Sequence, residues 1–351
     1  MLEYNDILLR HSKSIVASRS ECDTSMMLGN HEFAVPIVAA NMQSIITPNI
    51  CRRFDKADWF YVYHRIKGTN DVFEFVDYAH DAEMNIVSIS VGVKEEWLKL
   101  VRTLYKQGYI IDYFTVDVAL SYNENVTPIL DTIRECYPDA YIILGNGATA
   151  EWARWVIDRR LADCIKVGIG VSTSCRTRQY TGYGSSTVSS LLEVVKETNG
   201  EIDIISDGGL TVNSELVGFE KVKDKKTKKK QHVAIYKKEV AVGDVAKAIV
   251  IGANMVMSGA LFAYCTDVPA AKEGYYGNAS ARAKGHNTHV EGETLHQHIL
   301  RSKTVEEMME LAQYSLRSSI SYSGNRNLEE LRQNGKYDIK FAEGGLTRTS
   351  V

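Results

Sequence analysis

The sequence predicts a (β/α)8 barrel, the TIM-barrel architecture, with all of residues 1–351 in one catalytic domain. Short apolar runs alternate about eight times with stretches of helical character, as buried parallel strands and their crossover helices do. A chain of 351 residues with 44% hydrophobic side chains can bury one large core. Polar or glycine-rich clusters follow most of the runs, and a barrel brings the carboxyl ends of all its strands to one face.

The apolar runs are the expected strands. They occupy residues 35–40, 59–63, 86–90, 113–118, 141–144, 164–167, 202–205 and 254–257, and continuous apolar runs of this length are typical of strands buried on both faces. A doubly wound open sheet would show the same alternation. The polar clusters favour the barrel, and they are Asn41-Met42, Asp117, Gly145-Asn146, Gly168 to Thr177, Asp207 to Gly209 and Ser258-Gly259.

Helix signals occupy the intervals between these runs. Thr47 precedes Pro48, and proline suits the first turn of a helix. The segment EEWLKLVRTLYKQG is amphipathic and ends at Gly108, a residue type that commonly terminates helices. A further helix is expected over VGDVAKAI, after the seventh strand.

One insertion interrupts the alternation between the seventh strand and its helix. Residues 216–240 contain VGFEKV, then KDKKTKKKQ, then HVAIYKK, and alternating segments on both sides of a polar tip predict a β-hairpin on the catalytic face. Lysine runs are most often solvated turns. The second hypothesis is that Lys225 to Lys230 reach an anionic ligand, either a cofactor phosphate or nucleic acid.

The overall charge gives no argument for a nucleic-acid or membrane partner. The net charge is -3 and the isoelectric point is near 6.3, so any such role would have to be local. The start of the chain has no apolar signal core, and no run of about 18 apolar residues occurs, which predicts a cytoplasmic protein. Six scattered cysteines without a C-x-x-C pair disfavour both disulfides and a zinc site.

The loop KVGIGVSTSCRTR, residues 166–178, carries the strongest chemical signal. Its glycines permit tight turns, so that the following amides can cradle a phosphate. A thiolate at Cys175 would be a strong nucleophile, and Arg176 and Arg178 would lower the pKa of that thiol if they lie close. The alternative interpretation is a small buried hydrophobe. We expect that role for the cysteines outside this polar setting, Cys22, Cys51, Cys136, Cys164 and Cys265.

A second motif, ISDGG, ends the seventh expected strand. Asp207 offers a carboxylate that can hold two ribose hydroxyls, and Gly208 and Gly209 allow a phosphate to approach closely. A simple turn at the end of a strand would have the same sequence. Ser258 and Gly259 follow the eighth strand, where barrels often complete a phosphate pocket.

Together these motifs resemble the IMP dehydrogenase and GMP reductase family over nearly the whole chain, from LEYNDILLR to LRSSISYSG. The family loop reads G-x-G-P-G-S-x-C-T-T-R, and GIGVSTSCRTR keeps both glycines, the cysteine, the second threonine and the arginine. The segments S-D-G-G and G-D-V-A-K-A occur in the family's order. This combination is far more specific than any single motif.

The resemblance implies covalent chemistry at C2 of a purine nucleotide. Cys175 would be the nucleophile and Thr177 would assist it, while Glu291 of HVEGETL would relay a proton to Thr177; a solvent-exposed glutamate is the alternative interpretation of Glu291. Asp207 would hold the ribose. The other residues expected to bind the nucleotide are Ser172, Thr173, Gly208, Gly209, Ser258 and Gly259.

Several features favour the reductase branch. AANM at 39–42 and VDVALSY at 116–122 resemble its segments, and no room exists for the regulatory modules that dehydrogenases usually carry. The flap, residues 274–296, is short and lacks the dehydrogenases' Arg-Tyr pair. The resemblance therefore implies NADPH-dependent conversion of GMP, or a close analogue, to IMP and ammonia by a homotetramer. Arg65, Asp117 and Ala119 would bind the cofactor.

The chain also departs from the family pattern. Val171-Ser172 replaces Pro-Gly, Arg176 replaces the first threonine, and Thr288 and Val290 stand where the family has base-reading Arg and Ser. Fewer polar partners for the base imply altered purine discrimination. Two alternatives stay open: an IMP dehydrogenase without regulatory modules, and a catalytically silent purine-nucleotide-binding scaffold whose partner surface is the hairpin.

The C-terminal tail, residues 340–351, contains FAEGGL. This segment resembles a Glu-Gly-Gly through which some dehydrogenases help to bind a monovalent cation. The corresponding K+ site would use carbonyl groups of Gly168, Gly170 and Cys175. A flexible tail explains the same residues equally well.

Overall fold

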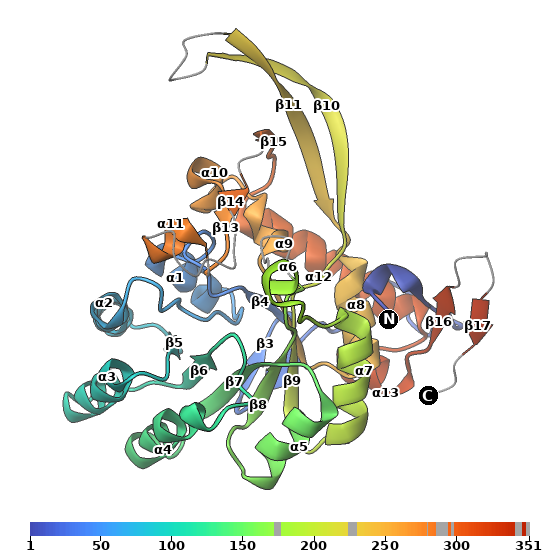
Figure 1. Cartoon of the computed structure of the whole chain (residues 1–351). Coiled ribbons are helices and arrows are strands. Elements are labelled where there is room, and N and C mark those ends of the chain that lie inside the picture. The colour runs from blue at the N-terminus through green and yellow to red at the C-terminus, as the bar shows by residue number, and fades with distance from the viewer. Residues whose placement is uncertain are drawn as a thin grey trace.

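The computed structural model describes residues 1–171, 177–223, 230–278, 280–285, 294–295, 298–340 and 346–348. Its centre is a parallel sheet curled into a barrel (Figure 1). Seven strands are hydrogen-bonded in the order β4-β12-β9-β8-β7-β6-β5. Their bounds are β4 Ile37–Ala39, β5 Ser88–Val91, β6 Tyr113–Asp117, β7 Tyr141–Gly147, β8 Cys164–Val167, β9 Asp203–Asp207 and β12 Met255–Ser258.

Residues 59–63 close the barrel between β4 and β5. Tyr61 bridges to Ala39 in β4, and Tyr63 bridges to Ile89 in β5, both in parallel orientation. The prediction of a regular strand over 59–63 is wrong in extent. Tyr61 pairs with β4 and Tyr63 already pairs with β5, so each neighbouring strand is paired at a single residue, which is too short for a strand. Closure confirms the (β/α)8 barrel and excludes the doubly wound sheet.

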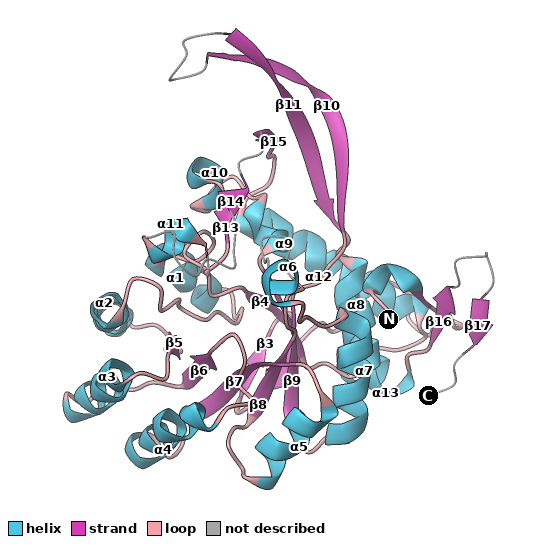
Figure 2. Cartoon of the chain, viewed as in Figure 1, coloured by secondary structure: helices cyan, strands magenta, loops and turns pink. Residues whose placement is uncertain are grey.

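Helices alternate with the strands and cover the outside of the barrel, as Figure 2 shows. Those following the eight strand positions are α1 Pro48–Lys56, α2 Thr69–Asp81, α3 Glu95–Lys106, α4 Thr127–Cys136, α5 Ala150–Asp158, α7 Thr187–Thr198, α8 Gly243–Ile251 and α12 Val305–Tyr322. Shorter helices are α6 Thr177–Thr181, α9 Ala260–Ala263, α10 Ala270–Glu273, α11 Ala281–Lys284 and α13 Leu328–Asn334, and single 3-10 turns occur at Tyr4–Asp6, Arg19–Glu21 and Glu124–Val126. Within the described ranges, no helix is both long and apolar enough to span a bilayer.

The predicted helix signals act as expected. The Thr47 side chain accepts a hydrogen bond from the backbone N–H of Ile50 and caps α1, whose first residue is Pro48. Helix α3 ends in the C-cap Gln107, and Gly108 follows with φ +80°, the left-handed conformation that glycine adopts without a steric penalty.

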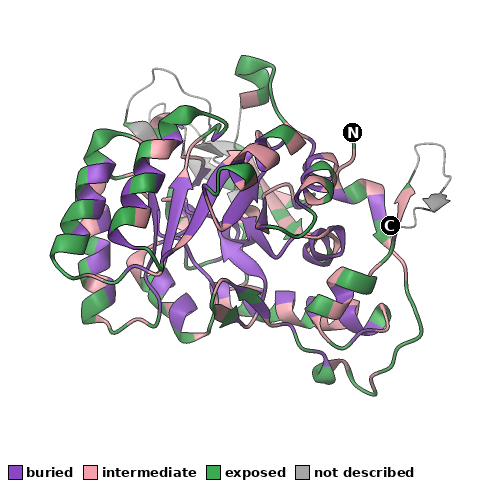
Figure 3. Ribbon diagram, turned by 90° about the horizontal axis from the view of Figure 1, so that it is seen from below, coloured by how far each residue is buried: buried purple, intermediate pink, exposed green. Residues whose placement is uncertain are grey.

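Aromatic side chains fill the end of the barrel opposite the predicted catalytic face. The ring of Phe60 lies 5.0 Å from Phe33 and 4.8 Å from Tyr113, and Tyr141 lies 5.5 Å from Tyr113, between ring centroids. The short hairpin of β2 (Met26–Leu28) and β3 (His31–Phe33) covers this end. Viewed from below, the strands are buried and the outer helix faces are exposed (Figure 3).

The inserted hairpin is longer than expected. β10 spans Val212–Lys223 and β11 spans Lys230–Val240, antiparallel from Val212 opposite Val240 to Lys223 opposite Lys230. The first four residues of β10 are too polar for their pattern to indicate a strand. The hairpin projects from the face where the barrel strands end (Figure 1).

The remaining strands form three small sheets. β13 (Tyr275–Tyr276) pairs with β14 (Thr294–Leu295) at the base of the flap, and β15 (His298–Leu300) joins β11. β16 (Tyr337–Lys340) pairs with β1 (Ile7–Leu9) and with β17 (Leu346–Arg348) in the tail.

Candidate active site

The carboxyl ends of β6, β7, β8 and β9 bring four polar residues together. Asp117 pairs with Gly145 in the register of β6 and β7, and Gly145 pairs with Lys166 in that of β7 and β8. Asn146 is the last residue but one of β7, and Asp207 is the last residue of β9. Because parallel strands place equivalent ends side by side, residues far apart in sequence form one cluster.

Lys166 is the centre of this cluster and is only 2% exposed. Its Nζ atom donates to Oδ1 of Asn146 at 2.5 Å and to Oδ2 of Asp207 at 2.7 Å, and it lies 3.3 Å from Oδ1 of Asp117. Asn146 Nδ2 also donates to Asp207 Oδ2 at 2.7 Å. A buried ammonium that contacts two carboxylates is a compensated charge, which fixes all three side chains.

The charges of the cluster hold one another ionised. Burial by itself lowers the pKa of Lys166, but Asp207 and Asp117 outweigh it, so that the pKa is raised. Burial likewise acts to raise the pKa of Asp117, whereas Lys166 and Arg65 lower it below its ordinary value. At neutral pH the lysine and Asp117 are therefore both charged.

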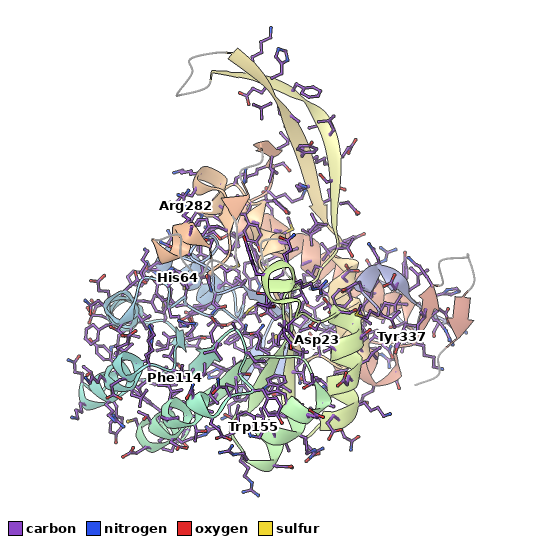
Figure 4. All side chains as sticks on the ribbon, viewed as in Figure 1. Asp23, His64, Phe114, Trp155, Arg282 and Tyr337 are labelled. Carbon is purple, nitrogen blue, oxygen red and sulfur yellow. The ribbon has the colours of Figure 1, made fainter. Side chains whose placement is uncertain are left out.

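Arg65 approaches Asp117 from the segment that closes the barrel. Its Nε and Nη2 atoms donate to the main-chain oxygen of Asp117 at 3.0 and 2.6 Å. The preceding residue, His64 (labelled in Figure 4), is buried, and burial lowers its pKa to about 4 although Asp71 opposes the shift. The cationic group next to Asp117 on this segment is therefore Arg65, and the imidazole of the adjacent His64 is neutral.

Ala119 lies on the exposed loop after β6, close to the same edge. This loop is tied to β7 by its backbone: Val118 N–H donates to the Gly145 oxygen at 2.9 Å and Ser121 N–H donates to the Asn146 oxygen at 2.8 Å. The structure therefore brings together Arg65 and Asp117, and Ala119 lies exposed two residues after Asp117.

Glycines allow close backbone packing after β9. Gly208 and Gly209 have φ of +79° and +76°, and a Cβ atom on Gly209 would lie 2.1 Å from Oγ1 of Thr187. A Cβ atom on Gly168 would lie 2.5 Å from the main-chain oxygen of Asp207. The contacts at Gly168 and Gly209 and the positive φ of Gly208 and Gly209 explain why glycine occupies these positions, and their role toward a phosphate stays a prediction.

Ser258 and Gly259 complete this edge of the barrel after β12. Ser258 Oγ accepts from the Leu261 N–H at 3.1 Å, so the serine stabilises the chain turn into α9. A Cβ atom on Gly259 would lie 2.5 Å from the Tyr275 hydroxyl and 3.1 Å from Sδ of Met42. The base of the flap therefore packs directly on this glycine.

The predicted catalytic loop is described only at its two ends. Gly168, Gly170 and Val171 precede the gap, and Thr177 begins α6 after it. Arg178 donates to the main-chain oxygen of Ser185. The other predicted residues, Ser172, Thr173, Cys175, Arg176, Thr288, Val290 and Glu291, lie outside the described residues, as do Lys225 to Lys229 and the Glu-Gly-Gly of the tail.

The five other cysteines are free and buried, as predicted. Burial raises the pKa of each thiol, to about 12 for Cys265 and well above the ordinary value for Cys51 and Cys164. Neutral, buried thiols are unreactive. Among the described residues, no group of three or more His, Cys, Asp or Glu side chains could hold a metal ion; the predicted K+ site, which depends on carbonyl groups and on Cys175, stays a prediction.

The sequence pattern does not reveal the roles of Lys166 and Asn146. Lys166 belongs to the strand CIKV, which is otherwise apolar. A charged residue inside a buried strand needs partners, and that requirement is the available signal. Asn146 is visible in the sequence only as part of a polar cluster.

Comparison with known proteins identifies the class. A model of the IMP dehydrogenase / GMP reductase domain matches residues 1–218 and 239–350, and the chain belongs to this family. The resemblance predicted from the motifs is therefore confirmed, and the unmatched residues 219–238 comprise the outer half of the hairpin and the part of β11 that pairs with β15.

The individual relatives named GMP reductase are similar over nearly their full length. The GMP reductase of Shouchella clausii is 35% identical over 95% of this chain and 93% of its own. Those of Helicobacter pylori strain J99 and Bacillus subtilis strain 168 are 34% and 33% identical, each over 95% of this chain and 94% of the relative.

Proposed function

We propose that this protein is an oxidoreductase that converts GMP, or a close purine nucleotide analogue, to IMP and ammonia with NADPH. The proposed enzyme is a single-domain barrel that assembles as a homotetramer. The similarity to proteins named GMP reductase supports the reaction class.

One observation carries the proposal: Lys166 joins the two carboxylates expected on either side of the reaction. Asp207, the expected ribose ligand, lies 2.7 Å from Nζ, and Asp117, on the expected cofactor side, lies 3.3 Å from it. Substrate and cofactor would thus meet across one buried ammonium. A preorganised arrangement of this kind lowers the cost of orienting two reactants.

The proposed chemistry begins with the thiolate of Cys175. Its sulfur adds to purine C2 while N3 takes a proton, and the C2–N bond then breaks as the amino group leaves as ammonia. Thr177 and Glu291 supply the proton to the leaving group. NADPH, held beside Arg65 and Asp117, would supply the hydride to C2, and cleavage of the C2–S bond with loss of the N3 proton would release IMP and regenerate the thiolate.

The described residues fit a nicotinamide cofactor next to the nucleotide. The main-chain oxygen of Asp117 accepts a hydrogen bond from Arg65, and its carboxylate lies next to the ammonium of Lys166. These residues would hold and orient the cofactor without taking part in the bond changes. Ala119 is exposed on the loop that follows Asp117.

The test is turnover of GMP with NADPH, followed by NADPH absorbance and by chromatography of IMP and ammonia. Cys175→Ala should abolish turnover, whereas Cys136→Ala, a control at the end of α4, should retain it. Full turnover by Cys175→Ala would overturn the covalent mechanism. Activity with IMP and NAD alone would identify a dehydrogenase, and nucleotide binding without turnover of any purine nucleotide would identify a scaffold.

A further inference from the structure

The inserted hairpin contacts the rest of the protein at its root and also through its ladder with β15. Residues 219–238 have no counterpart in the family model, yet β11 forms a parallel ladder with β15. Ile235 pairs with His298, Tyr236 with Ile299 and Lys237 with Leu300. Figure 1 shows β15 beside the lower half of the hairpin.

The root of the hairpin is held to the loop that carries Asp207 and Gly209. Ala241 N–H donates to the Thr211 oxygen at 2.8 Å, and Thr211 N–H donates to Oδ2 of Asp244 at 2.8 Å. Asp244 is buried and contacts Lys247 at 2.8 Å. The position of the hairpin is therefore fixed relative to the loop after β9.

The third strand leads to the loop after β12. β15 follows β14, which pairs with β13, where the Tyr275 hydroxyl packs against Gly259. Ser44 Oγ donates to the main-chain oxygen of Tyr276 at 2.8 Å and fixes β13 to the barrel. Beyond β15, Nη2 of Arg301 donates to the Ala270 oxygen at 3.1 Å. β15 is thus part of the framework around Ser258 and Gly259.

The two halves of the hairpin differ in their surroundings. The lower half, up to Gly218 opposite Ile235, belongs to a three-stranded sheet, whereas the outer half is a two-stranded ribbon that projects away from the barrel (Figure 1). A two-stranded ribbon is marginally stable alone, and a third strand stabilises it. The ladder with β15 therefore stabilises both partners.

We infer that the lower half of the hairpin is a positioning brace, which fixes the loop after β12 relative to the loop after β9. In terms of function the inference rests on the proposed reaction, because these two loops contain the residues proposed to surround the nucleotide. The brace acts on nucleotide binding through Gly209 and Gly259 and contributes no reacting group. The outer half is dispensable for this role.

Two truncations separate the brace from the rest of the hairpin. In the short variant, Asn-Gly replaces residues 219–234, so that Gly218 and Ile235 flank a two-residue turn and the ladder with β15 remains. In the bare variant, Asn-Gly replaces residues 213–239 and the ladder is lost. Thermal unfolding of both variants checks that the barrel is intact.

The short variant should keep the wild-type KM for GMP. The bare variant should raise KM or lower kcat/KM by about 10- to 100-fold, since small displacements of binding groups have effects of this size. Amide hydrogen exchange at 294–295 and 298–300 should accelerate in the bare variant only. Equal behaviour of the two variants in both measurements would overturn the brace.

Hydrogen exchange and the affinity for GMP need no turnover, so they separate failure of this inference from failure of the proposed reaction. If the bare variant does not fold, two double-cysteine variants test the pairing of β11 with β15 instead. Lys237→Cys with Leu300→Cys should form a disulfide on mild oxidation and keep the GMP affinity, because these positions are paired and exposed. Lys221→Cys with Leu300→Cys should not cross-link. Absence of the first disulfide, or equal formation of both, would overturn the inference.

Discussion

Lys166 and Asp207 form a buried ion pair, with Nζ of the lysine 2.7 Å from Oδ2 of the aspartate. Asp117 shares the same ammonium at 3.3 Å. Two carboxylates from different strands are therefore held at a fixed separation by one cation. Removing that cation leaves two like charges close together in a largely buried site.

We expect Lys166→Met to lower the free energy of unfolding by about 3–5 kcal/mol, the usual cost of leaving a buried charge without its partner. It should also weaken GMP binding, because Asp207 loses one of the two contacts that orient it among the described residues and keeps that with Asn146. Chemical denaturation and calorimetric titration measure the two effects. The exposed substitution Lys99→Met is the control; an equal effect of both substitutions would contradict the role given to Lys166.

The lowered pKa of Asp117 predicts a pH dependence of stability. A carboxylate whose pKa is lower in the folded state stabilises the fold above its unfolded pKa of about 3.9, and this contribution is lost as the pH falls through the folded value. The free energy of unfolding of Asp117→Asn should therefore fall less steeply than that of the wild type between about pH 4 and the folded pKa of Asp117. Urea unfolding across this range measures it, with the exposed Asp139→Asn as control.

The raised pKa of Lys166 predicts a loss of stability at alkaline pH. A lysine whose pKa is higher in the folded state stabilises the fold below its unfolded pKa of about 10.4, and the contribution disappears as the pH rises through the folded value. The wild type should lose stability in this alkaline range more steeply than Lys166→Met. Parallel slopes for the two proteins would count against the charged cluster.

Gly209→Ala should be strongly destabilising and should raise the KM for GMP. Its φ of +76° costs a side chain about 1–2 kcal/mol, and the added Cβ would lie 2.1 Å from Oγ1 of Thr187. Gly218→Ala on the hairpin is the matched control, because a Cβ there meets nothing within 4 Å. Adding Thr187→Ala should remove the contacts with Oγ1 and Cγ2 but leave the Cβ of residue 187 at 2.9 Å and the backbone cost unchanged, so rescue should be partial.

Alkylation of the native protein should modify Cys175 and spare the buried cysteines. Burial raises the pKa of Cys51, Cys164 and Cys265 and keeps these thiols protonated and shielded. GMP should protect Cys175 from iodoacetamide, as peptide mass mapping would show. Preferential labelling of Cys265, or of another buried thiol, would contradict the assignment of Cys175 as the reactive cysteine.

The sequence predicted the barrel because strand burial is visible in single runs such as CIKV and IDII. It overestimated residues 59–63, whose aromatic residues are buried but pair at only Tyr61 and Tyr63. Apolar character indicates burial in the core, whereas the length of a ladder depends on neighbours that a local pattern does not contain.

The position of Asp207 at the end of a strand was predictable from the single motif ISDGG, whereas its charge pairing was not, because that pairing is tertiary. Lys166 meets Asp117 and Asp207 only because the consecutive parallel strands β6, β7, β8 and β9 place their carboxyl ends at one edge of the sheet. The ladder of β11 with His298–Leu300 is equally tertiary, since three residues are too short to show alternation. Cys175 and Glu291 stay predictions from the resemblance.

The two ends of the hairpin are directly opposite each other, Val212 beside Val240. An insertion that leaves and rejoins a domain at adjacent points does not separate the elements on either side of it. That geometry explains how this chain keeps about a third of its residues identical to relatives along nearly their whole length while adding a long ribbon. The same geometry makes this junction a suitable insertion point. In another barrel of the family, a binding tag, a sensor loop or a second domain could be inserted at the corresponding position.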